Sequence, residues 1–322
     1  MLNQLLKLRL LLVSCSIFLL VGCASSQVSN EVSVEQSEYY QGKAILPFLA
    51  EQQAKTPEEA IQKADQAMSV NDIDRALFNY IRAYELDERN TEALIRIGDI
   101  HYSRDSFSIS FRAYQLALNV DPEQGRALKG TGMIQLQRKS YALAETTLKH
   151  SVERLLNEPA SQQSLLESYI GLGIINDLGG NFSNSVLYYH EAEKLAPKSA
   201  MVKSNLGYSY YMQEKWPLAE QTFSKALKIN NSYKPAWKNL GLTYARQEKY
   251  LEALGALEEV METAQAYNDI GYICMISQRY EQASYFFRKA IKEHPQYYTV
   301  AQQNLTRVKR LLASNPDGRS KL

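Results

Sequence analysis

The chain has 322 residues, of which 45% are hydrophobic and 22% charged, the balance of an ordinary globular protein. Its formal net charge of +1 gives no electrostatic reason to expect nucleic acid or a strongly charged surface as a partner. Tyrosine is abundant, at 22 residues, and its apolar ring with one polar group suits both packed helices and wet protein interfaces.

Residues 1–22 have the features of an export signal. Lys7 and Arg9 supply a positive start, and an apolar run of twelve residues follows from Leu10 to Val21. That run is too short to cross a bilayer as a helix, which needs ~20 residues. It ends in Leu-Val-Gly-Cys at residues 20–23, which resembles the lipobox of bacterial lipoproteins. The resemblance implies cleavage before Cys23 and lipidation of that cysteine, whereas the alternative is a plain signal peptide beside an incidental cysteine.

The residues after Cys23 indicate to which membrane a lipoprotein is sorted. Ala24 and Ser25 follow it, and no aspartate stands there to retain a lipoprotein in the inner membrane. The lipoprotein resemblance therefore implies the periplasmic face of the outer membrane. Cleavage would also remove Cys15 and leave Cys274 as the one free thiol, so no intramolecular disulfide is expected.

Residues 23–56 are expected to form the lipidated cysteine and a flexible tether. The segment is polar for most of its length and shows neither a helical nor a strand period. Its exception is the apolar stretch 45–49, for which docking on the first repeat and contact with a partner are both open.

Internal repeats dominate the rest of the chain. Glycines recur at intervals of 34, 41, 34, 34 and 30 residues, with large apolar residues, tyrosines and alanines at fixed distances around them. This pattern resembles the tetratricopeptide repeat of 34 residues, in which two antiparallel helices pack closely over a small residue at position 8. The glycines at that position are Gly98, Gly132, Gly173, Gly207, Gly241 and Gly271.

A second position tests the repeat independently of the glycines. Position 17 should begin the second helix, and a large apolar residue occupies it in every repeat: Ile73, Phe107, Tyr141, Phe182, Trp216, Tyr250 and Tyr280. The resemblance therefore implies an all-α, right-handed superhelical solenoid of about seven repeats over residues 57–297. Residues 298–313 are amphipathic and are expected to form a capping helix, followed by a polar tail over 314–322.

Two repeats depart from the period. The third carries about seven extra residues between Leu155 and Ser164, which either lengthen a helix or form a projecting loop. The sixth is four residues short near Glu262, so its last helical turn should be missing.

The resemblance places the binding groove on the first helices, chiefly at positions 2, 5, 9 and 12. That groove should be acidic at its N-terminal end and rich in tyrosine and methionine at its C-terminal end, a composition that suits a bound peptide or helix. Asn205 and Asn239 lack the basic partners of the known carboxylate clamp, which is therefore not expected. The candidate groove residues are Asp99, Tyr102, Lys129, Met133, Ile174, Asp177, Tyr208, Tyr211, Lys238 and Tyr272.

Nothing in the sequence favours catalysis. The histidines at 101, 150, 190 and 294 stand in no metal-ligand spacing or nucleophile motif, so no enzyme activity, metal or cofactor is expected. The expected partners are other envelope proteins, with a second copy of this chain among the candidates, and the membrane through the lipid.

The architecture of a leash followed by a long repeat array resembles the pilus-assembly lipoproteins, above all the TadD type of tight-adherence (Flp) pili and also the pilotins of type IV pili. That resemblance implies a non-enzymatic factor that assists secretin or pilus assembly. The alternatives are an NlpI-like scaffold for peptidoglycan hydrolases and proteases, and an accessory lipoprotein of exopolysaccharide export. The BamD type fits less well, because it usually has about five repeats.

Overall fold

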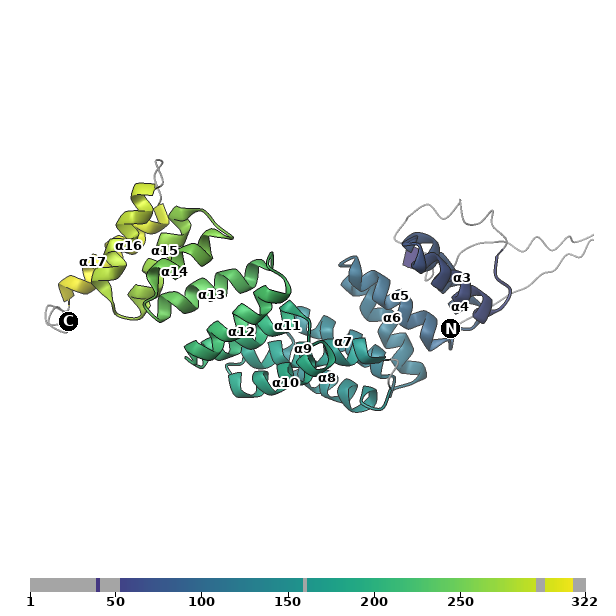
Figure 1. Ribbon diagram of the computed structural model, residues 1–322. Coiled ribbons are helices and arrows are strands. Elements are labelled where there is room, and N and C mark those ends of the chain that lie inside the picture. The colour runs from purple at the N-terminus through teal and green to yellow at the C-terminus, as the bar shows by residue number, and fades with distance from the viewer. Residues whose placement is uncertain (1–38, 41–52, 159–160, 294–298, 315–322) are drawn as a thin grey trace, which may run out of the picture.

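The computed structural model describes residues 39–40, 53–158, 161–293 and 299–314. The expected signal, Cys23, the apolar stretch 45–49 and the polar tail from 315 onward lie outside the described residues. Within the described part, consecutive helices pair into seven hairpins and a last helix packs on the seventh (Figure 1). The expected all-α repeat array with a terminal cap is thereby confirmed.

The hairpins follow one another along an elongated, curved array, with the first and last at opposite ends (Figure 1). The pairs are α3 Pro57–Ser69 with α4 Ile73–Leu86, α5 Thr91–Ser103 with α6 Phe107–Val120, α7 Gly125–Gln137 with α8 Tyr141–Leu155, α9 Gln162–Leu178 with α10 Phe182–Leu195, α11 Ala200–Met212 with α12 Trp216–Ile229, α13 Lys234–Arg246 with α14 Tyr250–Glu258, and α15 Thr263–Ile276 with α16 Tyr280–Glu293. The cap is α17, Thr299–Ser314.

The large residue at position 17 is the first residue of the second helix in all seven hairpins. The small residue at position 8 lies against the residue at position 24 of the second helix. A Cβ built on Gly207, for example, would lie 2.8 Å from Cε1 of Phe223, so only glycine allows this approach. Each interface between hairpins buries a separate apolar cluster, so the core runs along the array as a series of units.

Both irregular repeats have a defined structure. The insertion in the third repeat extends a helix, because α9 begins at Gln162 and has 17 residues, whereas the neighbouring α11 has 13. Residues 156–158 and Ser161 belong to the connection before it, and residues 159–160 are outside the description. The deletion in the sixth repeat shortens α14 to nine residues, where α12 has 14.

One residue in every turn between paired helices has a left-handed backbone. It stands at position 15, two residues before the second helix, and lets the chain reverse within three residues. The residues with positive φ are Asn71, Asp105, Lys139, Gly180, Glu214, Glu248 and Gln278.

We expect Gly180→Ala to destabilise the protein by about 1 kcal/mol, the usual cost of a left-handed alanine. Gly180 has a φ of 74°, and no atom lies within 4 Å of a Cβ built there, so the effect isolates backbone strain from packing. Urea unfolding followed by circular dichroism measures it. An unchanged midpoint would show that this turn relaxes without cost.

Candidate functional site

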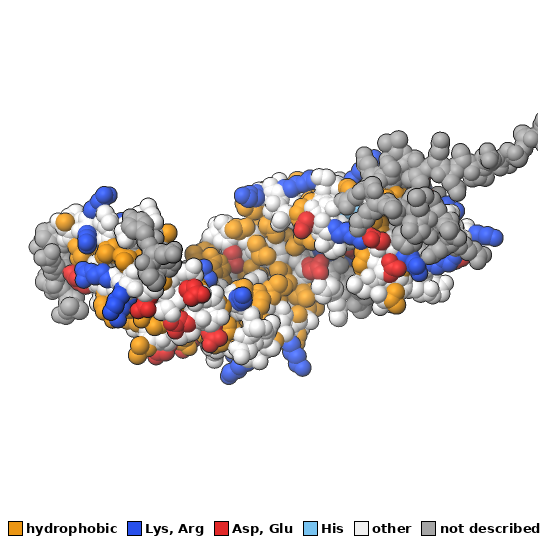
Figure 2. Space-filling model, turned by 90° about the horizontal axis from the view of Figure 1, so that it is seen from above, with side chains coloured by type: hydrophobic (Ala, Val, Ile, Leu, Met, Phe, Trp, Pro, Cys, Tyr) orange, Lys and Arg blue, Asp and Glu red, His pale blue; other side chains and the backbone are white. Residues whose placement is uncertain are grey.

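The first helices of neighbouring hairpins contact one another and form one continuous face. Contacts join α5 to α7, α7 to α9, α9 to α11, α11 to α13 and α13 to α15. Figure 2 shows the molecule from above, the side on which α5, α7, α9 and α11 lie in Figure 1. Hydrophobic side chains gather in a hollow in the middle of this view, and charged side chains lie on both sides of it.

Position 9 of the first helices changes in character along this face. Acids occupy it in the first two repeats, and apolar or aromatic residues occupy it in the other five. In chain order the residues are Asp65, Asp99, Met133, Ile174, Tyr208, Leu242 and Tyr272. The side chain at this position of the first helices thus changes from acidic to apolar or aromatic along the array.

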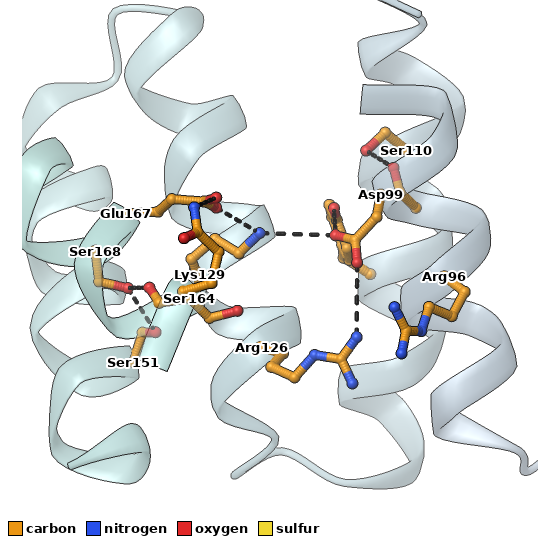
Figure 3. Close-up of polar contacts among 12 residues, drawn as sticks. Arg96, Asp99, Ser110, Arg126, Lys129, Ser151, Ser164, Glu167 and Ser168 are labelled. Carbon is orange, nitrogen blue, oxygen red and sulfur yellow. Dashed lines mark hydrogen bonds and ion pairs between the residues drawn. The ribbon is translucent and has the colours of Figure 1, made fainter. Parts of the chain in front are cut away.

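A cavity of about 430 Å³ lies where the charged part of this face meets the apolar part. It is formed by α5, α7 and the start of α9, whose charged side chains converge on it (Figure 3). Four of the candidate groove residues meet here: Asp99, Tyr102, Lys129 and Met133. The other lining residues are Arg96, Tyr114, Arg126, Gly130, Ser161, Gln163, Ser164 and Glu167.

Ion pairs connect α5, α7 and α9 around this cavity. Lys129 Nζ lies 3.0 Å from Glu167 Oε2 and 3.6 Å from Asp99 Oδ1, so it bridges α5 and α9 (Figure 3). Arg126 Nη1 donates to Glu92 Oε2 at 2.6 Å, and Arg96 Nε donates to the other oxygen of that carboxylate at 2.7 Å.

The Lys129 side chain is only 12% exposed, yet it stays charged. Burial lowers its pKa, but the negative charges of Asp99 and Glu167 outweigh burial and raise the pKa above its usual value. A buried cation held between two acids is costly to misplace, so this network fixes the positions of α5, α7 and α9 relative to one another.

Three tyrosines of second helices donate hydrogen bonds to aspartates on this face. Each tyrosine at position 24 reaches through its hairpin over the small residue and presents its hydroxyl near the first helix. Tyr114 donates to Asp99 at 2.6 Å, and Tyr189 donates to Asp177 at 2.9 Å. Tyr80 donates in the same way to Asp65. The fifth and seventh repeats carry phenylalanine at position 24, which needs no acceptor.

Several lining residues were not among the candidate groove residues. Arg96 stands at position 6 of its repeat, outside the positions carried over from the family. Ser161, Gln163 and Ser164 belong to the insertion, because the extra turn at the start of α9 forms one wall of the cavity. The signal for this wall was the insertion itself, but its length did not decide between a loop and a longer helix.

Aromatic and basic side chains form the C-terminal part of the face. Tyr211 meets Trp216 edge to face at 5.1 Å between ring centroids. Arg246 lies over both rings, at 5.9 Å and 5.5 Å from their centroids, and its Nε donates to Tyr211 Oη at 3.3 Å. This arrangement holds a guanidinium and two aromatic rings at the groove surface.

The remaining candidate residues are spread along the same face. Tyr208 and Tyr272 are 38% and 44% exposed, large values for aromatic rings on packed helices. Lys238 is exposed. Burial raises the pKa of the nearby Asp269, and the positive charge of Lys238 only partly opposes that rise. Ile174 is half-buried in the cluster beneath α9. These residues line successive hairpins and do not converge on one point.

Asp177 joins the fourth and fifth hairpins. Its carboxylate accepts from Ser209 Oγ at 2.8 Å as well as from Tyr189. Burial raises the pKa of Asp177, and the hydrogen bonds from Ser209, Ser185 and Tyr189 only partly oppose that rise.

We expect the parent to gain stability relative to an Asp177→Asn variant as the pH falls from 7 to 4. The folded pKa lies above the unfolded value, so acidification adds a proton to the folded state first and thereby favours folding. The asparagine side chain does not titrate and misses this gain. Urea unfolding at pH 7, 5.5 and 4 measures the difference, and a difference independent of pH would contradict the expectation.

The described residues contain neither a metal-binding group of side chains nor a membrane-spanning helix. In the parts of the chain that the structure describes, no three residues of the types His, Cys, Asp and Glu are grouped as a metal site would require. Among the same residues, none of the helices has the length and hydropathy needed to cross a bilayer.

Two segments of the chain are similar to known tetratricopeptide repeats. Two family models described as tetratricopeptide repeat match residues 179–235 and 264–297. The TPR repeat-containing protein MJ1428 of Methanocaldococcus jannaschii is 23% identical over 262 residues, which cover 74% of this chain and 44% of that protein. The chain spans less than half the length of the curated relatives that it matches, between 22% and 44%.

Among solved structures, a chain from the crystal structure of the APC/C hetero-tetramer Cut9–Hcn1 is similar with a TM-score of 0.53 and 16% identity, covering 82% of this chain and 50% of that one. The PilF structure from Pseudomonas aeruginosa is similar with a TM-score of 0.46 and 11% identity, covering 79% of this chain and 97% of that one. Likeness at this level reflects stacked helical hairpins, which proteins of unrelated function share.

Proposed function

We propose that this chain, two segments of which match tetratricopeptide-repeat models, is a non-enzymatic scaffold of the bacterial envelope, anchored by a lipid on Cys23, that assists secretin or pilus assembly. Tetratricopeptide repeats are protein-binding modules, and this supports the scaffold role. The anchor, the outer-membrane address and the assembly pathway are the finer parts of the proposal.

The observation that carries the proposal is the continuous face of the first helices. A partner chain lying along it would meet a charged cavity at Lys129 and then an apolar ladder through Ile174, Tyr208 and Tyr272. Exposed tyrosines supply large contact areas at low entropic cost, and they are enriched where proteins bind one another. The face therefore suits an extended or helical segment with a charged end and spaced apolar side chains.

The hydrogen-bond inventory of the cavity indicates which kind of charged end fits. Both oxygens of Glu92, Asp99 and Glu167 already lie close to donors. Arg96, by contrast, donates from its Nε to Glu92, and among the described residues its two terminal nitrogens are left for a ligand. A partner that brings an acceptor such as a carboxylate would complete this inventory.

The lipid anchor is supported by the sequence around Cys23, which lies outside the described residues. Several acyl chains at ~0.8 kcal/mol per buried CH₂ would hold the protein firmly on a membrane. The residue directly after Cys23 is Ala24 and not an aspartate, which supports the outer membrane as the destination. The likeness to TadD-type proteins rests on the order of leash and repeats.

The first test is co-purification from gently solubilised envelopes, with the full chain tagged at its C-terminus and a Cys23→Ala strain alongside. The proposal expects a secretin or pilus subunits to co-purify, and expects the unlipidated protein to lose them and to leave the membrane fraction. Recovery of murein hydrolases or a protease without any pilus component would overturn the assembly role in favour of the enzyme scaffold. Export components for exopolysaccharide would point to the third group.

A groove variant with a matched control tests the binding face. Tyr208→Ser and Tyr272→Ser remove exposed tyrosines from first helices, and Tyr285→Ser removes a tyrosine that is 54% exposed on the second helix α16. Captured partner should fall in the double groove variant and stay at the parental level in the control. Equal recovery from both would place the binding surface elsewhere.

A further inference from the structure

Two residues of the segment expected to be a flexible tether are buried in the repeat array. Tyr39 and Tyr40 are helical and only 1% and 8% exposed. They belong to one apolar cluster with Phe78 of α4 and with Ile97 and Ile100 of α5. Two neighbouring aromatic side chains from outside the repeats therefore contribute to the core that joins the first two hairpins.

The ring of Tyr39 packs between two aromatic residues of those hairpins. Its centroid lies 6.4 Å from that of Tyr84 in an edge-to-face arrangement, and 6.3 Å from the ring of His101. His101 stands at position 11, where the fifth and sixth repeats have Tyr210 and Tyr244. The second repeat thus has a smaller ring at a tyrosine position, and a tyrosine from the N-terminal segment packs beside it.

Tyr40 and Ala54 fix the chain on α4 from both sides of residues 41–53. The Tyr40 ring lies 6.3 Å from Phe78, and burial, helped by the charge of Glu85, raises the pKa of Tyr40 well above its usual value although Arg82 lowers it. Arg82 Nε donates to the carbonyl oxygen of Ala54 at 3.2 Å, and Ala54 is 1% exposed. The segment before the first repeat is therefore attached to that repeat at two separate points.

We propose that Tyr39 and Tyr40 are an intramolecular anchor that sets the length of the lipid leash. The proposal rests on the lipidation of Cys23 proposed above. With the anchor in place, fifteen residues, 24–38, separate Cys23 from the array, and a chain of that length spans at most about 50 Å when fully extended. Without it, the next attachment is at Ala54, and residues 24–53 span at most about 100 Å. The anchor thus holds the start of the groove within roughly half the distance that the sequence alone allows.

A larger ring at residue 101 should compete with Tyr39 for the same space. A tyrosine in place of His101 would put a larger ring, of the type found in the fifth and sixth repeats, where the Tyr39 ring now packs. Close-packed interiors do not accept an added ring without displacing another. The His101→Tyr variant should therefore release the N-terminal segment while the hairpins stay folded.

Hydrogen exchange tests the anchor directly in the full-length mature chain carrying Cys23→Ala. Peptides containing Tyr39 and Tyr40 should exchange at least about tenfold more slowly than unstructured chain. Protection there should be lost in His101→Tyr and in Tyr39→Ala, with the protection of α9 to α16 unchanged in both. Free exchange of this segment in the parent would overturn the anchor, and Tyr39→Ala keeps the test valid if His101→Tyr fails to fold.

Energy transfer tests the leash length. The lipidated chain, with a donor dye on a cysteine introduced at Glu88, is bound to phosphatidylethanolamine and phosphatidylglycerol vesicles containing an acceptor lipid. Transfer should fall in Tyr39→Ala relative to the parent, and equal transfer would show that the anchor does not set the reach. Flotation with the vesicles and the mass of the Cys23 peptide report lipidation separately, so its failure is distinguishable from failure of the anchor. Sedimentation of the parent as a dimer that Tyr39→Ala dissociates would show instead that the tyrosines dock on a second copy.

Discussion

Replacing Gly130 with alanine should destabilise the protein by about 3 kcal/mol, because the added methyl group would overlap a buried ring. A Cβ built on Gly130 would lie 2.3 Å from two ring atoms of Tyr114, and one on Gly98 would lie 2.5 Å from the opposite edge of the ring. The ring of Tyr114, which is 1% exposed, is thus held between two glycines on successive first helices. It has no room to move away from either.

This result reverses the usual effect of the substitution. Alanine in place of glycine within a helix normally stabilises it by up to about 1 kcal/mol. Gly255→Ala, in α14 with no atom within 4 Å of the built Cβ, is the control and should show that normal gain. Adding Tyr114→Leu to Gly130→Ala should recover part of the loss by removing the ring. Urea unfolding midpoints decide, and equal effects at Gly130 and Gly255 would refute the packing argument.

The second large effect is expected at Phe223. Its side chain is fully buried, and it packs in one cluster with Ala226 of its own helix and with Ala236 and Leu240 of α13. Phe223→Ala should cost about 4 kcal/mol, the usual loss for a buried aromatic residue. Because hairpins contact mainly their neighbours, the loss should fall on the fifth hairpin, where the ring lies against Gly207, and on its interface with the sixth.

Unfolding should therefore separate into two steps in the Phe223→Ala variant, with the C-terminal hairpins melting first. Hydrogen exchange resolved by peptide would show loss of protection in α12 to α17 and retained protection in α5 to α9. Leu251→Ala, at a side chain that is 85% exposed, is the control and should change stability by less than about 0.5 kcal/mol. A single cooperative transition in Phe223→Ala would contradict the model of neighbour-only coupling.

The repeat period predicted the fold in detail because each key position of the repeat has one structural role. The large residue at position 17 begins each second helix from Ile73 to Tyr280, as expected. The insertion before the fourth repeat could have been a longer helix or a projecting loop, and α9 begins as early as Gln162 because the inserted residues continue its helical pattern backwards by one turn. The period alone contains no information about residues outside it, and their conformation depends on what they pack against.

The candidate site was foreseen in outline only. Family positions led to Asp99, Lys129 and Met133, which the structure brings together in one cavity. They did not lead to Arg96 or Ser164, because a three-helix cavity depends on side-chain reach and on the extra turn of α9. The burial of Tyr39 was not foreseen either, since nothing periodic surrounds it and its packing depends on the smaller ring at His101.

The short α14 has a mechanical consequence. If the lipid end and a partner at the far hairpins were pulled apart, the same force would cross every interface between hairpins, as in a chain of springs in series. Such a chain opens at its weakest link, and the sixth hairpin, whose second helix has nine residues where that of the fifth has 14, offers the least surface to resist. The array should therefore lengthen first at the sixth hairpin, so that the N-terminal hairpins and their charged cavity stay folded under loads that already stretch the C-terminal end.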